Sequence, residues 1–149
     1  MSLHMLHHLS LAVTDIARSD RFYNAALTAL GYIRVWSYDN AVGYGAVGGG
    51  DKFAIKLSRG PVVPADGGFH IAFAAPDRAA VARFHSEALA HGGMDNGPAG
   101  LRPHYGENYY AAFVIDPDGY QVEAVIDAPA STAVGNQGDK LIFAPIVAG

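Results

Sequence analysis

The sequence predicts an α+β fold made of two tandem β-α-β-β-β units, which form curved mixed sheets around a cavity. The main evidence is an internal repeat, in which a strand-like stretch led by histidine is followed by aspartate and a helix-like pattern. His70 follows His8 by 62 positions, and Asp77 follows Asp15 by the same 62. A fixed self-similarity of this length indicates a duplicated supersecondary unit, so we expect both copies to fold alike.

The first unit is expected over residues 5–58. Apolar residues alternate with small or polar ones over residues 6–13, which is typical of a half-buried strand. Asp15 is a suitable N-cap for the helical pattern that follows, and Gly31 suits the end of that helix. Three further strands are predicted at residues 32–38, 41–47 and 52–57, with a glycine-rich turn before the last.

The second unit is expected over residues 68–126, after a linker at residues 59–67 that is rich in proline and glycine. A strand, a helix capped by Asp77, and a strand somewhere between residues 93 and 109 come first. The turn Asp116-Pro-Asp-Gly119 then joins two apolar runs, which predicts a hairpin over residues 109–126. Residues 127–149 form a C-terminal extension, expected to add an edge strand or to pack on a partner subunit.

Composition narrows the function classes. The chain has 149 residues, half of them apolar, and a formal net charge of −4, so one globular domain is expected. It contains no cysteine, which removes disulfide and thiolate chemistry. No basic cluster suggests nucleic-acid binding, and no stretch resembles a signal peptide or a membrane span. We therefore expect a cytoplasmic protein with no nucleic-acid or membrane partner.

Two histidines and one carboxylate are predicted to share the cavity side of the sheets. The large apolar residues of each first strand should face the helix, which leaves His8 and His70 on the opposite face, beside small residues. Alternation along the last strand puts Glu123 on the same side, together with Gln121. If the sheets curve toward one another, these three side chains converge. Two imidazoles and one carboxylate bind a divalent transition metal and leave coordination positions open for catalysis.

Simpler readings of the same residues stay open. A histidine on a strand is commonly structural, and Glu123 would also suit a wet sheet face. His7 competes with His8, but it falls in register with Leu9, so we assign it to the other face or to a frayed strand start.

The residues quoted above resemble the vicinal oxygen chelate superfamily, which has the glyoxalase/bleomycin-resistance/extradiol-dioxygenase fold. The resemblance runs from Leu6 to Ile126. It rests on four stretches: His8-Leu-Ser-Leu-Ala-Val-Thr-Asp15, the helix from Phe22-Tyr23 to Leu30-Gly31, Phe69-His70-Ile-Ala-Phe73, and Phe113-Val-Ile-Asp-Pro-Asp-Gly-Tyr-Gln-Val-Glu123.

The resemblance implies a metal site and a type of chemistry. His8, His70 and Glu123 are the positions that would hold a divalent ion (Fe, Mn, Zn or Ni). Members of the family use such an ion to hold neighbouring oxygens of a small substrate. The reaction could be that of a lyase, an isomerase, a transferase or a dioxygenase, because a fold does not fix a reaction.

One position departs from the glyoxalase I pattern, which has a fourth ligand, a glutamate, in the first unit. Aligning residues 51–56 with residues 118–123 puts Lys56 there. An ammonium has no free lone pair, so this argues against the glyoxalase I reaction. The three-ligand pattern of extradiol dioxygenases and fosfomycin-type thiol transferases remains. Lys56 would then bind an anionic group of the substrate, or pair with Glu123 in the metal's place and leave a metal-free pocket.

The other candidates are Lys56 of the first unit and polar or aromatic residues of the loop and hairpin in the second unit. Lys56, Tyr109 and His104 are the candidate catalytic side chains. The candidate substrate contacts are Arg102, Tyr105, Phe113 and Gln121. A basic, aromatic loop suits an anionic or phenolic ligand, although ordinary surface packing would explain it equally well.

We therefore expect a metal-dependent enzyme that acts on a small molecule. The alternative is a metal-free protein that sequesters a small molecule, as the bleomycin-resistance members do. Edge strands of such half-barrels commonly pair between chains, so a homodimer is expected. In that case each site would draw His8 from one chain, and His70 and Glu123 from the other.

Overall fold

A computed structural model describes residues 4–64 and 68–130 of the chain. In chain order the elements are β1 (Leu9–Val13), α1 (Ile16–Ala29), β2 (Tyr32–Tyr38), β3 (Ala41–Ala46), β4 (Phe53–Leu57), β5 (His70–Ala74), α2 (Arg78–Ala90), β6 (Met94–Asp95), β7 (Gly100–Leu101), β8 (Tyr109–Ile115) and β9 (Gln121–Asp127). The β-α-β-β-β order of the first unit is confirmed. In the second unit the strand expected between residues 93 and 109 consists of two short pieces, β6 and β7.

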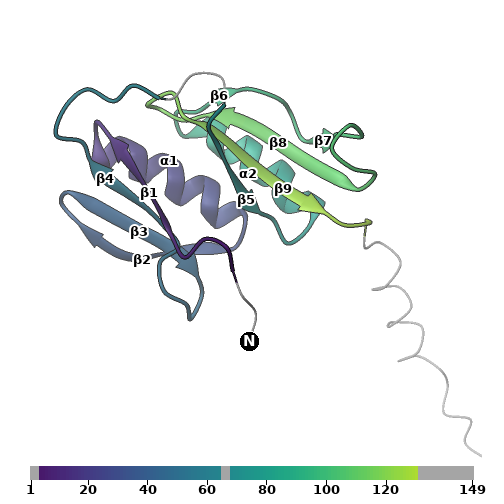
Figure 1. Ribbon diagram of the computed structural model, residues 1–149, viewed down its shortest axis with the longest axis horizontal. Coiled ribbons are helices and arrows are strands. Elements are labelled where there is room, and N and C mark those ends of the chain that lie inside the picture. Colours follow the sequence, from purple (N-terminus) through teal and green to yellow (C-terminus); the bar gives the residue numbers. More distant parts are fainter. Residues whose placement is uncertain (1–3, 65–67, 131–149) are drawn as a thin grey trace, which may run out of the picture.

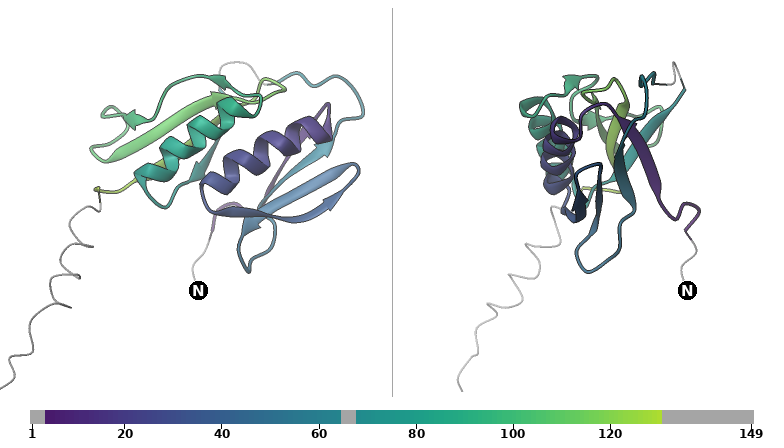
Figure 2. Two further views of the ribbon diagram at one scale, coloured as in Figure 1. Left: turned by 180° about the vertical axis from the view of Figure 1, so that it is seen from behind. Right: turned by 90° about the vertical axis from the view of Figure 1, so that its left-hand side faces the viewer.

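Each unit forms one mixed sheet. Sheet A has the order β1-β4-β3-β2, and sheet B has the order β5-β9-β8-β6, with β7 also paired to β8. The last strand of each unit returns beside the first, in parallel, while the other pairings are antiparallel. The two sheets lie side by side and the two helices pack against one another behind them (Figures 1 and 2).

The helix boundaries follow the predicted capping residues. A carboxylate oxygen of Asp15 accepts from the Arg18 amide at 3.0 Å, and one of Asp77 accepts from the Ala80 amide at 2.7 Å. These contacts satisfy helix N–H groups that have no partner inside the helix. At the end of α1, Gly31 has a φ of 92°, a conformation that suits glycine. The repeat seen in the sequence therefore predicts both helix starts correctly.

The core lies between the helices and one face of each sheet, as the alternation of the first strands predicts. Leu11 and Ile71 are buried in it, whereas the residues of opposite parity in β1 and β5 are exposed. The outward-facing surface of each sheet, away from the helices, is called its open face here. The largest fully buried side chains of the core are Tyr23, Tyr44, Phe22, Phe84, Leu27 and Ile55.

The Asp-Pro-Asp-Gly turn between β8 and β9 joins the two units. The Asp118 carboxylate accepts from the Thr14 hydroxyl at 2.5 Å and pairs with the Arg18 guanidinium at 2.9 Å. The neighbouring Asp116 is buried and accepts from the Tyr23 hydroxyl of α1 at 2.5 Å. Burial raises the pKa of Asp116, although the hydrogen bonds that Asp116 accepts from the Tyr23 hydroxyl and from the backbone amides of Asp118 and Tyr120 act in the opposite direction. A turn expected only to shape a hairpin thus anchors the second unit on the helix start of the first.

The open face of sheet A has a floor of small residues. Gly43 pairs with Ala54 of β4 and with Trp36 of β2, and the indole ring of Trp36 lies over it. A Cβ atom at Gly43 would lie 2.3 Å from Cε2 of that ring. The glycine therefore makes room for the aromatic side chain on this face.

Gly43→Ala is accordingly expected to displace the Trp36 ring and to cost about 1–3 kcal/mol of stability, as overpacking does. Trp36 is the single tryptophan of the chain, so its fluorescence emission and urea unfolding report the change directly. Gly60→Ala is the matched control, because nothing lies within 4 Å of an added Cβ there. Unchanged emission and stability for Gly43→Ala would contradict this account of the open face.

No helix in residues 4–64 and 68–130 is both long and apolar enough to span a membrane. The predicted linker at 59–67 and extension at 127–149 fall partly outside the described residues, because residues 65–67 and 131–149 are not among them. The edge strand or partner contact expected for the extension therefore lies outside the described residues.

Candidate functional site

A buried carboxylate lies on the open face of sheet B. Glu123 is only 1% exposed. Its Oε2 atom is 3.1 Å from Nε2 of His70, and its Oε1 atom accepts a hydrogen bond from the Tyr109 hydroxyl. The His70 side chain is half exposed, so the cluster has one side open to solvent. These three side chains form the candidate site.

The strand pattern explains why a carboxylate is held there. Val122 and Ala124 on either side of Glu123 belong to the core, so alternation along β9 turns Glu123 to the opposite face. In the sheet, Glu123 pairs with Ala72 of β5 and Phe113 of β8. The small Ala72 leaves space beside the carboxylate, and the ring of Phe113 shields the carboxylate from water. The side chain is thus fixed by a central strand and desolvated by its neighbours.

Tyr109 supports the carboxylate through its hydroxyl. Burial, together with the hydrogen bond and negative charge of Glu123, raises the pKa of the Tyr109 phenol. The phenol therefore stays protonated near neutral pH and acts as a hydrogen-bond donor. In this arrangement one oxygen of Glu123 is engaged by Tyr109, and the other faces His70.

His8 does not join this cluster within one chain, which corrects the predicted convergence. It lies just before β1, at the edge of sheet A, and its Nδ1 atom is 2.9 Å from Nδ1 of His7. Within residues 4–64 and 68–130, no three His, Cys, Asp or Glu side chains are gathered closely enough to hold a metal ion. The physical reason is the packing of the helices side by side, which sets the open faces next to each other instead of opposite one another. His7 and His8 are both exposed and both precede the first residue of β1, so the position before the strand that is expected for His7 holds for His8 as well.

The strand registers also correct the assignment of Lys56. Ala72, two residues after His70, pairs with Glu123, whereas Ser10, two residues after His8, pairs with Ala54. The counterpart of Glu123 in sheet A is therefore Ala54, and Lys56 lies two pairs further along, opposite Ala12. Alanine has no donor atom, so the expected lack of a fourth ligand still holds, but for a different residue. None of the ion pairs found among the described residues places Lys56 on Glu123.

The aromatic and basic loop residues gather beside this cluster. The Arg102 guanidinium lies over the Phe113 ring, 5.4 Å from its centre. The Tyr105 ring is 5.2 Å from that of Tyr109 and 4.2 Å from that of His104, measured between ring centres. Gln121, a further predicted contact, pairs with His70 and lies on the same face as Glu123. The structure thus brings His104, Tyr105, Tyr109, Arg102, Phe113 and Gln121 to one end or face of sheet B.

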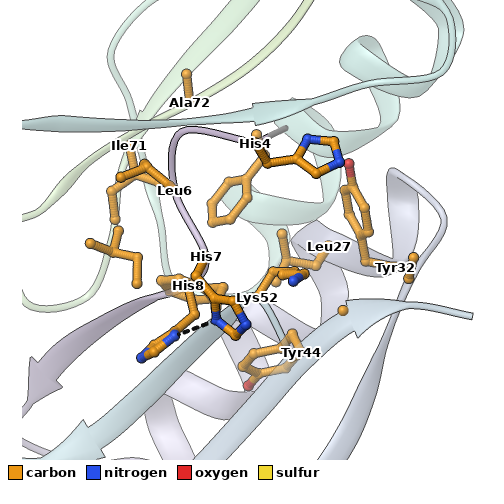
Figure 3. A pocket seen from close by; sticks show the side chains of 15 residues that line it. His4, Leu6, His7, His8, Leu27, Tyr32, Tyr44, Lys52, Ile71 and Ala72 are labelled. Carbon is orange, nitrogen blue, oxygen red and sulfur yellow. Dashed lines mark hydrogen bonds between the residues drawn. The ribbon is translucent and has the colours of Figure 1, made fainter. Parts of the chain in front are cut away.

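The sequence gives no signal for a second feature, a pocket of about 380 Å³ between the two units. It is lined by residues of the N-terminal segment, of both sheets and of α1, including Leu27 and Lys52 (Figure 3). Its walls meet only when the units pack together, so no local motif marks it.

A family model described as "Glyoxalase/Bleomycin resistance protein/Dioxygenase superfamily" matches residues 5–124. A glyoxalase/bleomycin resistance protein from Albidiferax ferrireducens is 28% identical, with a TM-score of 0.71, over 82% of this chain and 98% of that one. A glyoxalase-related enzyme from Fulvimarina pelagi is 26% identical, with a TM-score of 0.63, over 83% and 88%.

A fosfomycin resistance protein, FosX, from Listeria monocytogenes is 17% identical, with a TM-score of 0.59, over 83% of this chain and 93% of that one; it shares the fold. A search of curated proteins gives no match.

Proposed function

The chain belongs to the Glyoxalase/Bleomycin resistance protein/Dioxygenase superfamily, and from that premise we propose that it is a divalent-metal-dependent enzyme. Its substrate would be a small molecule that presents neighbouring oxygens to the metal. The reaction would be that of a lyase, an isomerase, a transferase or a dioxygenase. Support comes from two possible metal ligands on sheet B: the Glu123 carboxylate and the His70 imidazole face one another, and the His70 side chain is half exposed to solvent.

The burial of Glu123 is the observation that carries the proposal. An ionised carboxylate loses several kcal/mol, by order of magnitude, when it leaves water, unless charges and hydrogen bonds compensate. Here the compensation comes from His70 and Tyr109, both of which reach the carboxylate from the open side of the sheet. A purely structural position on β9 would be filled more stably by an apolar residue. A metal ion between Glu123 and His70 would supply the missing positive charge.

A second copy of the chain would complete the ligand set. Among residues 4–64 and 68–130, His8 lies at the edge of sheet A and does not form a metal-binding group with His70 and Glu123. In a homodimer that places sheet A of one chain over sheet B of the other, the partner's His8 would become the third ligand. Two imidazoles and one carboxylate then leave positions for substrate.

The remaining residues of this site have roles that follow from their positions. Tyr109 holds one Glu123 oxygen and so orients the other. Arg102 supplies positive charge for an anionic substrate group, and the rings of Phe113 and Tyr105 supply apolar contact. His104 lies beside the Tyr105 ring and would exchange a proton with a substrate bound there. The metal, when bound, would polarise the substrate oxygens.

Elemental analysis of protein purified without added metal tests this function, with His70→Ala as the control. We expect stoichiometric iron, manganese, nickel or zinc in the parent protein and its loss in the variant, because the imidazole is a ligand. Equal metal in both proteins would mean adventitious binding. No metal in either, before or after incubation with each ion, would rule the metal-dependent enzyme out.

Subunit mixing tests the shared site. His8→Ala and His70→Ala would each lack metal alone, but a mixed dimer contains one site with every ligand intact. We expect metal to return when the two variants are unfolded and refolded together. If metal does not return in verified mixed dimers, the ligands do not come from two chains.

A second function, metal-free sequestration of a small molecule, is favoured by one observation. His70 and Tyr109 already satisfy both oxygens of Glu123, so the cluster is complete without an ion. If the protein sequesters a small molecule without metal, that molecule binds the metal-free protein and leaves it chemically unaltered. The elemental analysis above distinguishes this function from the metal-dependent enzyme.

A further inference from the structure

The pocket between the units has an apolar interior and a polar rim. Its interior walls are apolar side chains of α1 and of both sheets that belong to the core or pack against it: Leu9, Leu27, Tyr44, Phe53, Ile71 and Phe73. Its volume of about 380 Å³ is within the usual range for sites that hold small organic molecules. The pocket is open to solvent on one side, so a small molecule can reach its apolar interior.

The rim carries positive charge. Lys52 and the neighbouring His7 and His8 are exposed and line the pocket, and Figure 3 shows them around its lower end. The described residues that line it include no aspartate and no glutamate. An anion at the rim would therefore meet a lysine ammonium and two imidazoles, with no carboxylate to repel it.

We propose that this pocket binds a small amphipathic carboxylic acid, with its apolar body between the two units and its carboxylate at Lys52. The two halves of the argument are independent, because the interior selects for an apolar body and the rim selects for an anionic head. A neutral alcohol of the same length would use only the first, and an alkylammonium would be repelled by the second.

The pocket is separate from the candidate metal site. Neither His70, Glu123 nor Tyr109 lines it, and from β5 it takes only Ile71, Ala72 and Phe73. His8 is the one residue that the two regions share. The proposal itself needs no metal, and its test uses Lys52 and Ala46, which are not residues of the candidate metal site.

Calorimetric titration of the full chain with decanoate, decanol and decyltrimethylammonium tests the proposal. We expect saturable binding of decanoate near one molecule per chain, weaker binding of decanol, and the weakest binding of the cation. Lys52→Glu is expected to weaken decanoate binding by at least about tenfold while changing decanol binding little. Arg59→Glu makes the same charge change on an exposed loop outside the pocket and is expected to leave both unchanged.

Ala46→Phe provides a second, steric variant. Ala46 is exposed and lines the pocket, so a phenyl ring there would reduce the space without entering the core. Both decanoate and decanol should then bind at least about tenfold more weakly. In the parent protein, decanoate should shift the methyl NMR signals of Leu27 and Ile71. Binding that is non-saturable, indifferent to Lys52→Glu, or insensitive to Ala46→Phe overturns the proposal.

Discussion

Glu123→Gln is expected to lower the affinity for divalent metal by at least about a hundredfold, because the loss of a direct ligand exceeds the 10–100-fold typical of a supporting residue. Glutamine keeps the shape of the side chain but removes the negative charge and one anionic oxygen. Competition with a chromophoric chelator measures the affinity, and circular dichroism shows whether the fold is retained.

Tyr109→Phe is the matched comparison for Glu123→Gln. It removes only the hydroxyl that donates to Glu123 Oε1, so a smaller loss of about 10–100-fold is expected. If both variants bind metal as tightly as the parent protein, Glu123 is not a ligand. If both lose the fold instead, the cluster is a structural network and the metal-free function is favoured.

Asp116→Ala is expected to cost about 3 kcal/mol of unfolding free energy. The buried Tyr23 hydroxyl and the backbone amides of Asp118 and Tyr120 would lose their shared acceptor. Leaving buried donors unpaired costs about 1–3 kcal/mol for each group, less whatever water can restore. Urea unfolding measures the loss.

Asp116→Asn is the control for this variant. Its amide oxygen can still accept from both backbone amides, and its amino group can donate to the Tyr23 hydroxyl, so a smaller loss is expected. Equal stability for Asp116→Ala and the parent protein would show that the turn does not anchor the units.

The features that sequence predicts are those set by local chemistry. The histidine-led strands, the Asp15 and Asp77 caps and the inward-facing Leu11 and Ile71 all follow from short-range periodicity. The face of Glu123 follows from the same alternation. For these features, neighbours along the chain carry enough information.

The features that sequence misses depend on how the units meet. The separation of His8 from Glu123 follows from the packing of one helix against the other, which no strand pattern records. The misplacement of Lys56 has a different cause: the two units differ by two residues between the last turn and the last strand, and an ungapped alignment hides that shift. The pocket lined by Leu27 and Lys52 likewise exists only after assembly.

The anchored Asp-Pro-Asp-Gly turn makes the duplicated halves unequal partners. Asp118 takes its hydrogen bonds from Thr14 and Arg18, more than ninety positions earlier in the chain. Severed from the first half, the second would keep its own sheet but lose the support beneath the strand that carries Glu123. The two units are similar in fold, yet the second depends on contacts from the first to hold the strand of Glu123 in place.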